Sequence, residues 1–117
     1  MAIYTSYFAN WRKFPEGAYT LGVTRHPPKG VDNWVFVSPS DELLRDYKAG
    51  RISEHIYSRR YMKELSYQNR EGTITFLRDL EHKYGNVVLC CYEKKGDFCH
   101  RQLLAEWLKP ELEINEL

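Results

Sequence analysis

One stretch of the sequence decides the fold: Asn86-Val87-Val88-Leu89-Cys90-Cys91-Tyr92. It is continuously apolar after its first residue, and its two valines favour the extended conformation of a strand. Such a run is typical of a strand that is buried on both faces, as in a parallel sheet covered by helices. Because side chains alternate across a strand, we expect Cys90 and Cys91 to face opposite sides of this sheet.

Three amphipathic helices are predicted before this strand. Ser40 and Ser53 each precede apolar residues at helical spacing, and they are suitable N-caps for the first two helices. The third helix is predicted at about residues 73–84, with Gly85 as its stop. A last helix is predicted after the buried strand, with Asp97 as its N-cap.

The first part of the chain is predicted to supply the other strands. Residues 3–8 and 19–24 are rich in β-branched and aromatic residues, and residues 34–37 suit a short strand or extended piece. Residues 10–17 are predicted as a loop, and the acidic tail at residues 111–117 is expected to fray or to dock loosely. This order of elements indicates an α/β fold, a small mostly parallel sheet flanked by helices, in a single domain of residues 1–117.

Composition and charge exclude several classes of protein. The 117 residues are 43% hydrophobic and 28% charged, which is typical of a globular chain and not of a disordered one. The net charge of +1 excludes a histone-like polyanion binder. No apolar run reaches the ~18–20 residues of a membrane span and no secretory signal is recognisable, so we expect a cytoplasmic protein without a membrane partner. The three cysteines form no disulfide framework, and we expect them to be reduced.

The segment that follows the buried strand carries the chemistry. It leads from Cys91 at the carboxyl end of a strand to Arg101 in the first turn of a helix. α/β proteins bind ligands at the carboxyl edge of the sheet, and the unpaired N–H groups at the start of a helix attract anions. Arg101 adds a planar donor for phosphate or carboxylate. Cys99 and Cys91 are candidate nucleophiles or redox groups, because a helix N-terminus beside cations favours the thiolate. His100 and Glu93 are candidate acids or bases.

A second segment is expected to reach the same edge of the sheet. Arg25 and His26 follow the second predicted strand, and they converge with Arg101 if that strand and the buried strand are parallel neighbours. Arg25 and Arg101 would then hold one anion, and His26 would line the pocket. Tyr7 and Trp11 leave the first strand and are further candidates for the pocket wall, although both also suit the core.

Two other forms of chemistry fit the spacing poorly. A zinc site would use Cys91, Cys99 and His100 with His26 as a fourth ligand, but an adjacent Cys and His at a helix start rarely point at one metal, and no paired C-x-x-C is present. For a phosphatase-like or rhodanese-like loop, Cys91 precedes Arg101 by too many residues and Cys99 precedes it by too few. No phosphate loop and no dinucleotide fingerprint is present. We therefore predict no metal and no cofactor, and packing in the core remains an alternative role for the cysteines.

The helices predicted within residues 41–65 suggest a function of a different class. They interleave basic residues with tyrosines, a composition that suits a nucleic-acid surface as well as an ordinary solvated face. These residues are Arg45, Lys48, Arg51, Arg59, Arg60 and Lys63, together with Tyr47, Tyr57 and Tyr61. The alternative function is therefore a non-catalytic module that binds nucleic acid or a protein through these helices.

Several motifs are spread over nearly the whole chain. They are Ser6-Tyr7-Phe8-Ala9-Asn10-Trp11-Arg12-Lys13, then Tyr47-Lys48-x-Gly50-x-Ile52-Ser53, and, as the most specific, Cys91-Tyr92-Glu93-Lys94-x-Gly96-Asp97-Phe98-Cys99-His100-Arg101. With these motifs the chain resembles short bacterial members of the domain of unknown function 488 family, for which no activity is generally established. The resemblance implies a small α/β domain with a functional site around Arg25, Cys91, Glu93, Cys99, His100 and Arg101. Cys90, Gly30 and Gln102 depart from the family's pattern but leave its Cys-His-Arg core intact.

The sequence therefore predicts a pocket at the N-terminus of the last helix that binds a small anionic ligand or a nucleotide. If the protein is an enzyme, we expect it to act on a nucleotide or on a component of nucleic acid.

Overall fold

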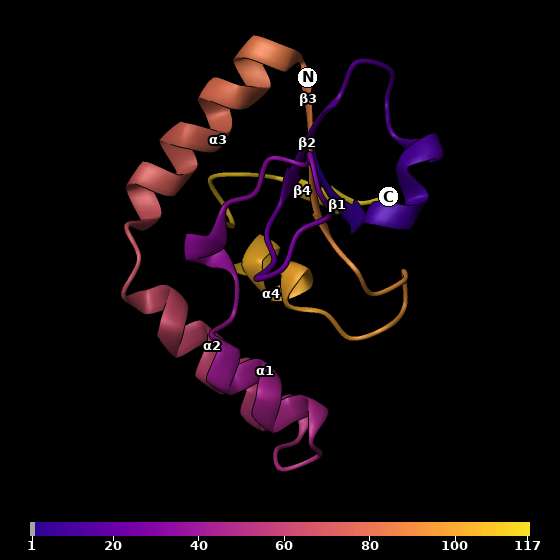
Figure 1. The fold of residues 1–117 in the computed structure, drawn as a ribbon. Coiled ribbons are helices and arrows are strands. Elements are labelled where there is room, and N and C mark those ends of the chain that lie inside the picture. The colour runs from indigo at the N-terminus through magenta and orange to yellow at the C-terminus, as the bar shows by residue number, and fades with distance from the viewer. Residues whose placement is uncertain (1) are drawn as a thin grey trace.

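The computed structural model describes residues 2–117, and a sheet of four parallel strands forms its centre (Figure 1). β3, Asn86–Cys91, coincides with the apolar run and has a partner on each side, β1 at Ala2–Tyr7 and β2 at Tyr19–Gly22. β4, Ile114–Glu116, pairs with the other edge of β1, so the strand order is β2-β3-β1-β4. The predicted α/β fold with a buried parallel strand at its centre is confirmed.

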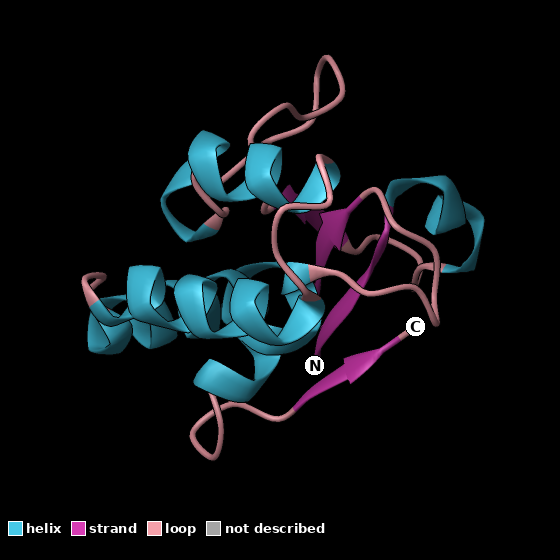
Figure 2. Ribbon diagram, turned by 90° about the horizontal axis from the view of Figure 1, so that it is seen from below, coloured by secondary structure: helices cyan, strands magenta, loops and turns pink. Residues whose placement is uncertain are grey.

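The connections between the strands contain helices. These are η1 (Phe8–Lys13) and η2 (Val35–Val37), which are 3-10 helices, and α1 (Asp41–Lys48), α2 (Glu54–Ser66), α3 (Arg70–Tyr84) and α4 (His100–Trp107). Figure 2 shows the α-helices gathered on one side of the sheet and η1 on the other. The predicted N-caps are confirmed, because the Ser40 and Ser53 hydroxyls each accept a hydrogen bond from the backbone N–H three residues later. Gly85 ends α3 with a φ of 84°, a conformation that favours glycine.

The core lies between the sheet and the α-helices. Val87 and Leu89 of β3 pack there with buried side chains such as Leu77 of α3 and Leu104 of α4. Cys90 is also fully buried but stands outside this cluster, on the face that η1 covers. Because side chains alternate along β3, Cys91 at its end lies on the face covered by the α-helices, opposite to Cys90, as predicted.

Several predicted boundaries differ from the structure: the second strand ends at Gly22 and not at residue 24, and the third helix begins at Arg70 and not near residue 73. Phe8 belongs to η1 and not to the first strand, so the loop predicted from residue 10 begins in a helical turn. Residues 34–37 form no strand, because η2 turns there and pairing with β2 is limited to an isolated bridge at Asn33. Asp97 is not the N-cap of the last helix: its backbone N–H donates to the Lys94 carbonyl and closes a four-residue turn, and α4 begins after Cys99.

The acidic tail is an ordered strand, which corrects the expectation that it frays or docks loosely. Leu112 and Ile114 are buried in the core, while Glu113 and Asn115 are exposed. The backbone N–H of Leu117 donates to the Thr5 carbonyl at 2.9 Å, and the Thr5 hydroxyl donates to the Glu116 carboxylate at 2.6 Å. Because this alternation matches the period of a strand, one side of the tail packs against the core while its backbone pairs with β1.

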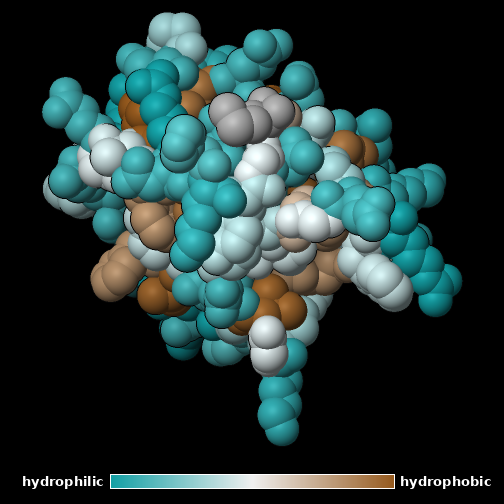
Figure 3. Space-filling view, turned by 90° about the horizontal axis from the view of Figure 1, so that it is seen from above, coloured by the Kyte–Doolittle hydropathy of each residue, from teal (hydrophilic) through white to brown (hydrophobic). Residues whose placement is uncertain are grey.

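The side of the molecule on which β1 and β3 begin is largely hydrophilic (Figure 3). Hydrophobic side chains are scattered over this face and do not gather in one wide patch. Among residues 2–117, no helix is both long enough and apolar enough to cross a membrane. The candidate site lies at the opposite end of the sheet, where the strands finish.

Candidate functional site

A pocket opens at the carboxyl ends of β2 and β3. Because these strands are parallel neighbours, the segments that follow them meet at one edge of the sheet. There the Tyr92 hydroxyl donates a hydrogen bond to the His26 carbonyl. The pocket has a volume of about 220 Å³, and residues of α1, α2 and the start of α4 complete its wall. The structure thus brings Arg25 and His26 to the edge that bears Cys99, as a parallel arrangement predicts.

Aromatic rings form one wall of this pocket. Tyr47 of α1 and Tyr57 of α2 have ring centroids 5.0 Å apart, and the Phe98 ring lies 5.6 Å from Tyr47 and 5.2 Å from Tyr57. Burial raises the pKa of Tyr57, so its hydroxyl stays neutral and can only exchange hydrogen bonds with a ligand. The side chains of Arg25 and Lys48 line the same pocket. Aromatic rings and two cationic side chains therefore line the same cavity.

A buried cluster of sulfur and nitrogen atoms adjoins the pocket. Cys91 at the end of β3, Cys99 at the N-cap of α4 and His100 in its first turn are all at most 5% exposed. The two cysteines are joined as a disulfide, with their Cα atoms 7.6 Å apart, and the free cysteine among the described residues is Cys90. This pairing differs from the expectation of three reduced thiols, because the fold, and not the spacing along the chain, brings the two sulfurs together. Cys99 and His100 also line the pocket.

His100 is held as a neutral imidazole with a fixed orientation. Its Nε2 lies 2.5 Å from the Val23 carbonyl oxygen, so Nε2 carries the proton and donates it there. Nδ1 is then the nitrogen with the free lone pair, and it faces the Cys99 Sγ at 3.6 Å. Burial, together with the charge of Arg101, outweighs the Val23 contact and lowers the pKa of His100 to about 4. The side chain is therefore a hydrogen-bond acceptor or a ligand at neutral pH.

The Arg101 guanidinium is fully buried and engaged on all three nitrogens. Its Nε and Nη2 donate to the two oxygens of Glu116 at 3.0 and 2.6 Å, and Nη1 donates to the Cys91 Sγ at 2.9 Å and to the Glu93 carbonyl at 2.7 Å. Arg101 therefore holds the end of β3, the following loop and β4 together, and it is not among the residues that line the pocket in the described part of the chain. Sequence reasoning missed Glu116, although an arginine on an apolar helix face needs a carboxylate partner when it is buried.

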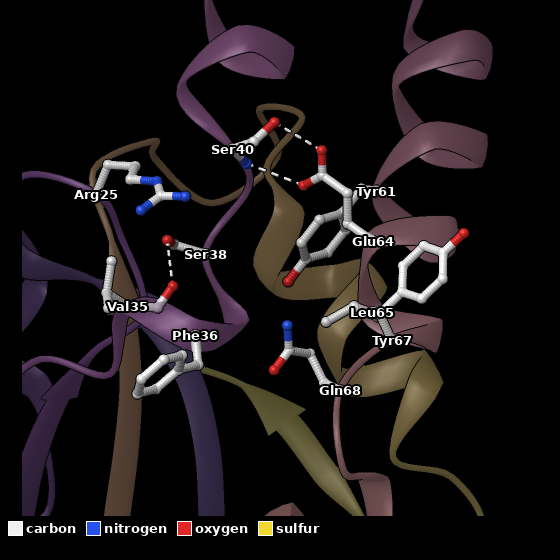
Figure 4. Close-up of a pocket in the computed structure, with 10 residues that line it drawn as sticks. All are labelled: Arg25, Val35, Phe36, Ser38, Ser40, Tyr61, Glu64, Leu65, Tyr67 and Gln68. Carbon is white, nitrogen blue, oxygen red and sulfur yellow. Dashed lines mark hydrogen bonds between the residues drawn. The ribbon is translucent and has the colours of Figure 1, made fainter.

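Arg25 stands between the pocket and a second cavity of about 470 Å³, which lies between η2 and α2 (Figure 4). Its Nε donates to the Pro39 carbonyl at 3.1 Å. Across this cavity the Glu64 carboxylate accepts hydrogen bonds from the Ser40 N–H at 2.9 Å and from the Ser40 hydroxyl at 2.6 Å. Within residues 2–117 the terminal nitrogens of Arg25 have no hydrogen-bond partner, so they remain available to a ligand.

Other residues predicted for the site lie at its margin or away from it. His26 is at the rim, highly exposed, with its Nε2 3.6 Å from an Asp41 carboxylate oxygen. Glu93 lines the pocket beside Cys99 and is exposed. Tyr7 ends β1 and Trp11 lies on η1, where it is 62% exposed and contacts Arg12. Neither Tyr7 nor Trp11 lines this pocket in the described part of the chain.

Of the six basic residues predicted for a nucleic-acid surface, two are paired within the protein, while Arg45, Lys48, Arg59 and Lys63 are exposed. Arg51 and Arg60 both pair with Asp46, with nitrogen to oxygen distances of 3.2 and 2.9 Å. Tyr57 and Tyr61 are buried, and the Tyr61 hydroxyl donates to the carbonyl of a core residue at 2.6 Å. The rings expected to stack on bases therefore belong to the core and to the pocket wall.

The fold and the site define a small α/β protein in which cysteine, histidine and arginine side chains meet beside a pocket at the carboxyl edge of a parallel sheet. The family model DUF488-N3a, described as the active DUF488-N3 subclade, matches residues 3–112. The chain therefore belongs to the DUF488 family of uncharacterised proteins, as its motifs indicate. A search of curated proteins and a search of solved structures each gave no significant match.

Proposed function

We propose that the pocket at the ends of β2 and β3 binds a small ligand that carries both an aromatic ring and an anionic group, as a mononucleotide does. The observation that carries this proposal is the meeting of Arg25 and Lys48 with the rings of Tyr47, Tyr57 and Phe98 in one cavity. The rings would stack against a base, and the cations would pair with a phosphate. The volume of about 220 Å³ is below the ~300–1,000 Å³ of pockets that enclose drug-sized ligands, so we expect nothing larger than a mononucleotide.

Arg25 is the residue that we assign to the anion. Arg101 was the other candidate, but its three nitrogens already donate to Glu116, Cys91 and Glu93. Arg25 uses only Nε on the protein, so its two terminal nitrogens can form the bidentate contact that suits a phosphate.

The chemistry of the site would come from the buried cluster beside the pocket. Cys99 and His100 line the pocket directly, and Cys91 touches Cys99 from behind. Glu93 is an exposed carboxylate at the same rim and is suited to carry a proton between a ligand and solvent. We therefore propose an enzyme that acts on a nucleotide or a nucleotide component, with Cys99, His100, Cys91 and Glu93 as its reactive groups.

A thermal-shift experiment tests the binding step. The reduced protein is heated with each of the four ribonucleoside monophosphates, with phosphate, with sulfate and with a short single-stranded oligonucleotide. A ligand at a hundred times its Kd adds about 2.7 kcal/mol, which raises the Tm of a chain of this size by about 10 °C. Arg25→Ala should abolish the shift, whereas Arg59→Ala, which removes an exposed arginine outside the pocket, should keep it.

Two results would overturn the proposal. One is the absence of a shift with every mononucleotide and anion. The other is a shift with the oligonucleotide alone that persists in Arg25→Ala and declines steeply with salt, because counterion release then dominates binding. That second result would favour the non-catalytic nucleic-acid module at residues 41–65.

A further inference from the structure

We propose that Cys91, Cys99 and His100 bind one soft divalent metal ion in the reduced protein, and that zinc is the ion that suits them. This inference deepens the proposed function, on which it rests for the role of the ion in the pocket. The ligand atoms of the three residues all lie within 4.8 Å of one another, and all three residues are buried. Thiolate and imidazole are the ligands that zinc prefers, and three protein ligands with one open position are typical of catalytic zinc sites.

One pair of the ligand atoms already has the spacing of a tetrahedral site. The Cys99 Sγ and the His100 Nδ1 are 3.6 Å apart. Bonds of ~2.3 Å to sulfur and ~2.0–2.1 Å to nitrogen at a tetrahedral angle place these two atoms about 3.6 Å apart. The Cα atoms of Cys91 and Cys99 are 7.6 Å apart, beyond the ~4.4–6.8 Å usual for residues joined by a direct disulfide. Once the disulfide is reduced, this backbone separation allows an ion to lie between the two thiolates.

The imidazole is already oriented as a ligand. Metal-binding histidines usually donate their second ring N–H to a carbonyl or carboxylate, which fixes the tautomer. His100 makes this contact, because its Nε2 lies 2.5 Å from the Val23 carbonyl oxygen and its Nδ1 points at the sulfurs.

The surrounding charges are balanced for a dication. Arg101 donates from Nη1 to the Cys91 Sγ at 2.9 Å, a contact that would stabilise the Cys91 thiolate in the reduced protein. Its own charge is compensated by Glu116, which lies 2.6 Å from Nη2. The pair of Arg101 and Glu116 is neutral, and a dication with two thiolates is also neutral. The buried site therefore accepts the ion without leaving a net charge in the core.

The open position of such an ion would face the pocket. Cys99 and His100 line the pocket, whereas Cys91 lies behind them. The adjacency of Cys99 and His100, which argues against zinc in the sequence, is resolved by the backbone. Cys99 is the extended N-cap residue with φ −149° and ψ 151°, and His100 is the first helical residue. This change of conformation between neighbours turns both side chains toward one point.

Zinc titration of the full chain tests the inference. The protein is reduced, stripped with a chelator and titrated with zinc in competition with a chromogenic chelator, and metal content is measured by mass spectrometry. We expect one zinc per chain. Cys91→Ser, Cys99→Ser and His100→Asn should each weaken binding at least 100-fold. Cys90→Ala is the matched control, because it removes a buried thiol from the other face of the same strand, and it should bind zinc like the unmodified protein.

A second measurement does not depend on the folding of the variants. In the unmodified protein, zinc should slow alkylation of Cys91 and Cys99 at least tenfold, as followed by peptide mass spectrometry. Cobalt in place of zinc should give a sulfur-to-metal charge-transfer band with the intensity of two thiolates. Absence of zinc binding by the reduced protein, a cobalt spectrum without thiolate character, or equal loss of binding in Cys90→Ala would each overturn the inference.

The two proposals fail in different ways. If zinc does not bind but a nucleotide still raises the Tm in an Arg25-dependent manner, the metal site is wrong and the pocket stands. If zinc binds in a one-to-one ratio but no mononucleotide or anion raises the Tm, the pocket proposal is wrong and the metal site stands.

Discussion

Arg101 links three segments of the chain beside the site through its hydrogen bonds to Cys91, Glu93 and Glu116. A guanidinium that is fully buried must be compensated, and here Glu116 supplies both carboxylate oxygens. Burial by itself raises the pKa of Glu116, but the hydrogen bonds from Arg101 and Thr5 and the charge of Arg101 outweigh it and lower the pKa below its usual 4.5. The ion pair therefore persists throughout the neutral range.

We predict that Glu116→Ala destabilises the protein by about 3 kcal/mol or more, because it leaves an unpaired buried charge. Urea unfolding at pH 7 measures the loss, and Glu113→Ala, which removes an exposed carboxylate from the same tail, should cost less than about 0.5 kcal/mol. The penalty should shrink as the pH falls from 4.5 through the lowered pKa of Glu116, because protonation then weakens the pair in the unmodified protein as well. Equal stability of the two variants would contradict the role given to Glu116.

We predict that His100 makes the metal-free, reduced protein less stable in acid. Its pKa is about 4 in the folded state against an ordinary 6.5, so below pH 6.5 the unfolded chain takes up a proton that the folded chain does not. The stability that His100 contributes is complete above pH 6.5 and is lost as the pH falls to 4, by about 3 kcal/mol in total. Urea unfolding in a chelator at pH 7 and pH 5 should show this slope reduced in His100→Gln. His82→Gln, at an exposed position, should retain the slope.

Glu116 also marks the limit of prediction at the residue scale. The motif containing Cys99, His100 and Arg101 stands out in the sequence, because three reactive side chains follow one another. The carboxylate that neutralises Arg101 lies 15 residues later in an acidic tail, where nothing local distinguishes it from its neighbours. Only the alternation of Leu112, Ile114 and Glu116 along one side of a strand gives a signal for it.

At the scale of elements, the N-caps permit a matched comparison. Ser40 and Ser53 each accept a hydrogen bond from a backbone N–H at 3.2 Å, but Ser40 also donates to Glu64 of α2 at 2.6 Å. We predict that Ser53→Ala costs about 1 kcal/mol and that Ser40→Ala costs about 2 kcal/mol, since it also leaves one carboxylate oxygen of Glu64 without its donor, while the backbone N–H of residue 40 keeps the other. Urea unfolding of both variants and of Glu64→Gln measures the difference, and equal losses for the two serines would argue against a link between α1 and α2 through Ser40.

The elements that the sequence predicts well are those with local signals. The apolar run of β3, the cap residues Ser40 and Ser53 and the stop at Gly85 all act over a few residues. The error at the start of the last helix arises because a turn and a helix cap compete for the same residue. Asp97 is a good cap by type, but its N–H donates to the Lys94 carbonyl in a turn. The helix begins two residues later, where the Cys99 N–H donates to the Gln102 side chain at 3.1 Å.

At the scale of the whole molecule, the parallel order β2-β3-β1-β4 creates the site. It places the end of β2, with Arg25, beside the end of β3, with Cys91, although 66 residues separate them in the chain. The sequence predicts this meeting only on the condition that the two strands are neighbours, because strand order depends on contacts between distant segments. The same limit explains why β4 is missed: its pairing partner, β1, lies at the other end of the chain.

The last strand provides a test of the fold as a whole. A tail that frays would be dispensable, so a chain that ends after Glu111 would keep its stability. In the structure, residues 112–117 bury Leu112 and Ile114, cover the edge of β1 and neutralise Arg101. We predict that the truncated chain loses about 5 kcal/mol or more, which is comparable to the entire stability of a small domain, because two buried side chains and an ion pair are lost together. Circular dichroism during urea unfolding should then show no cooperative transition. A transition at the same urea concentration as that of the full-length chain would mean that the tail contributes nothing to the fold. Removal of Leu117 alone, which has a single hydrogen bond to Thr5, should shift the midpoint only slightly.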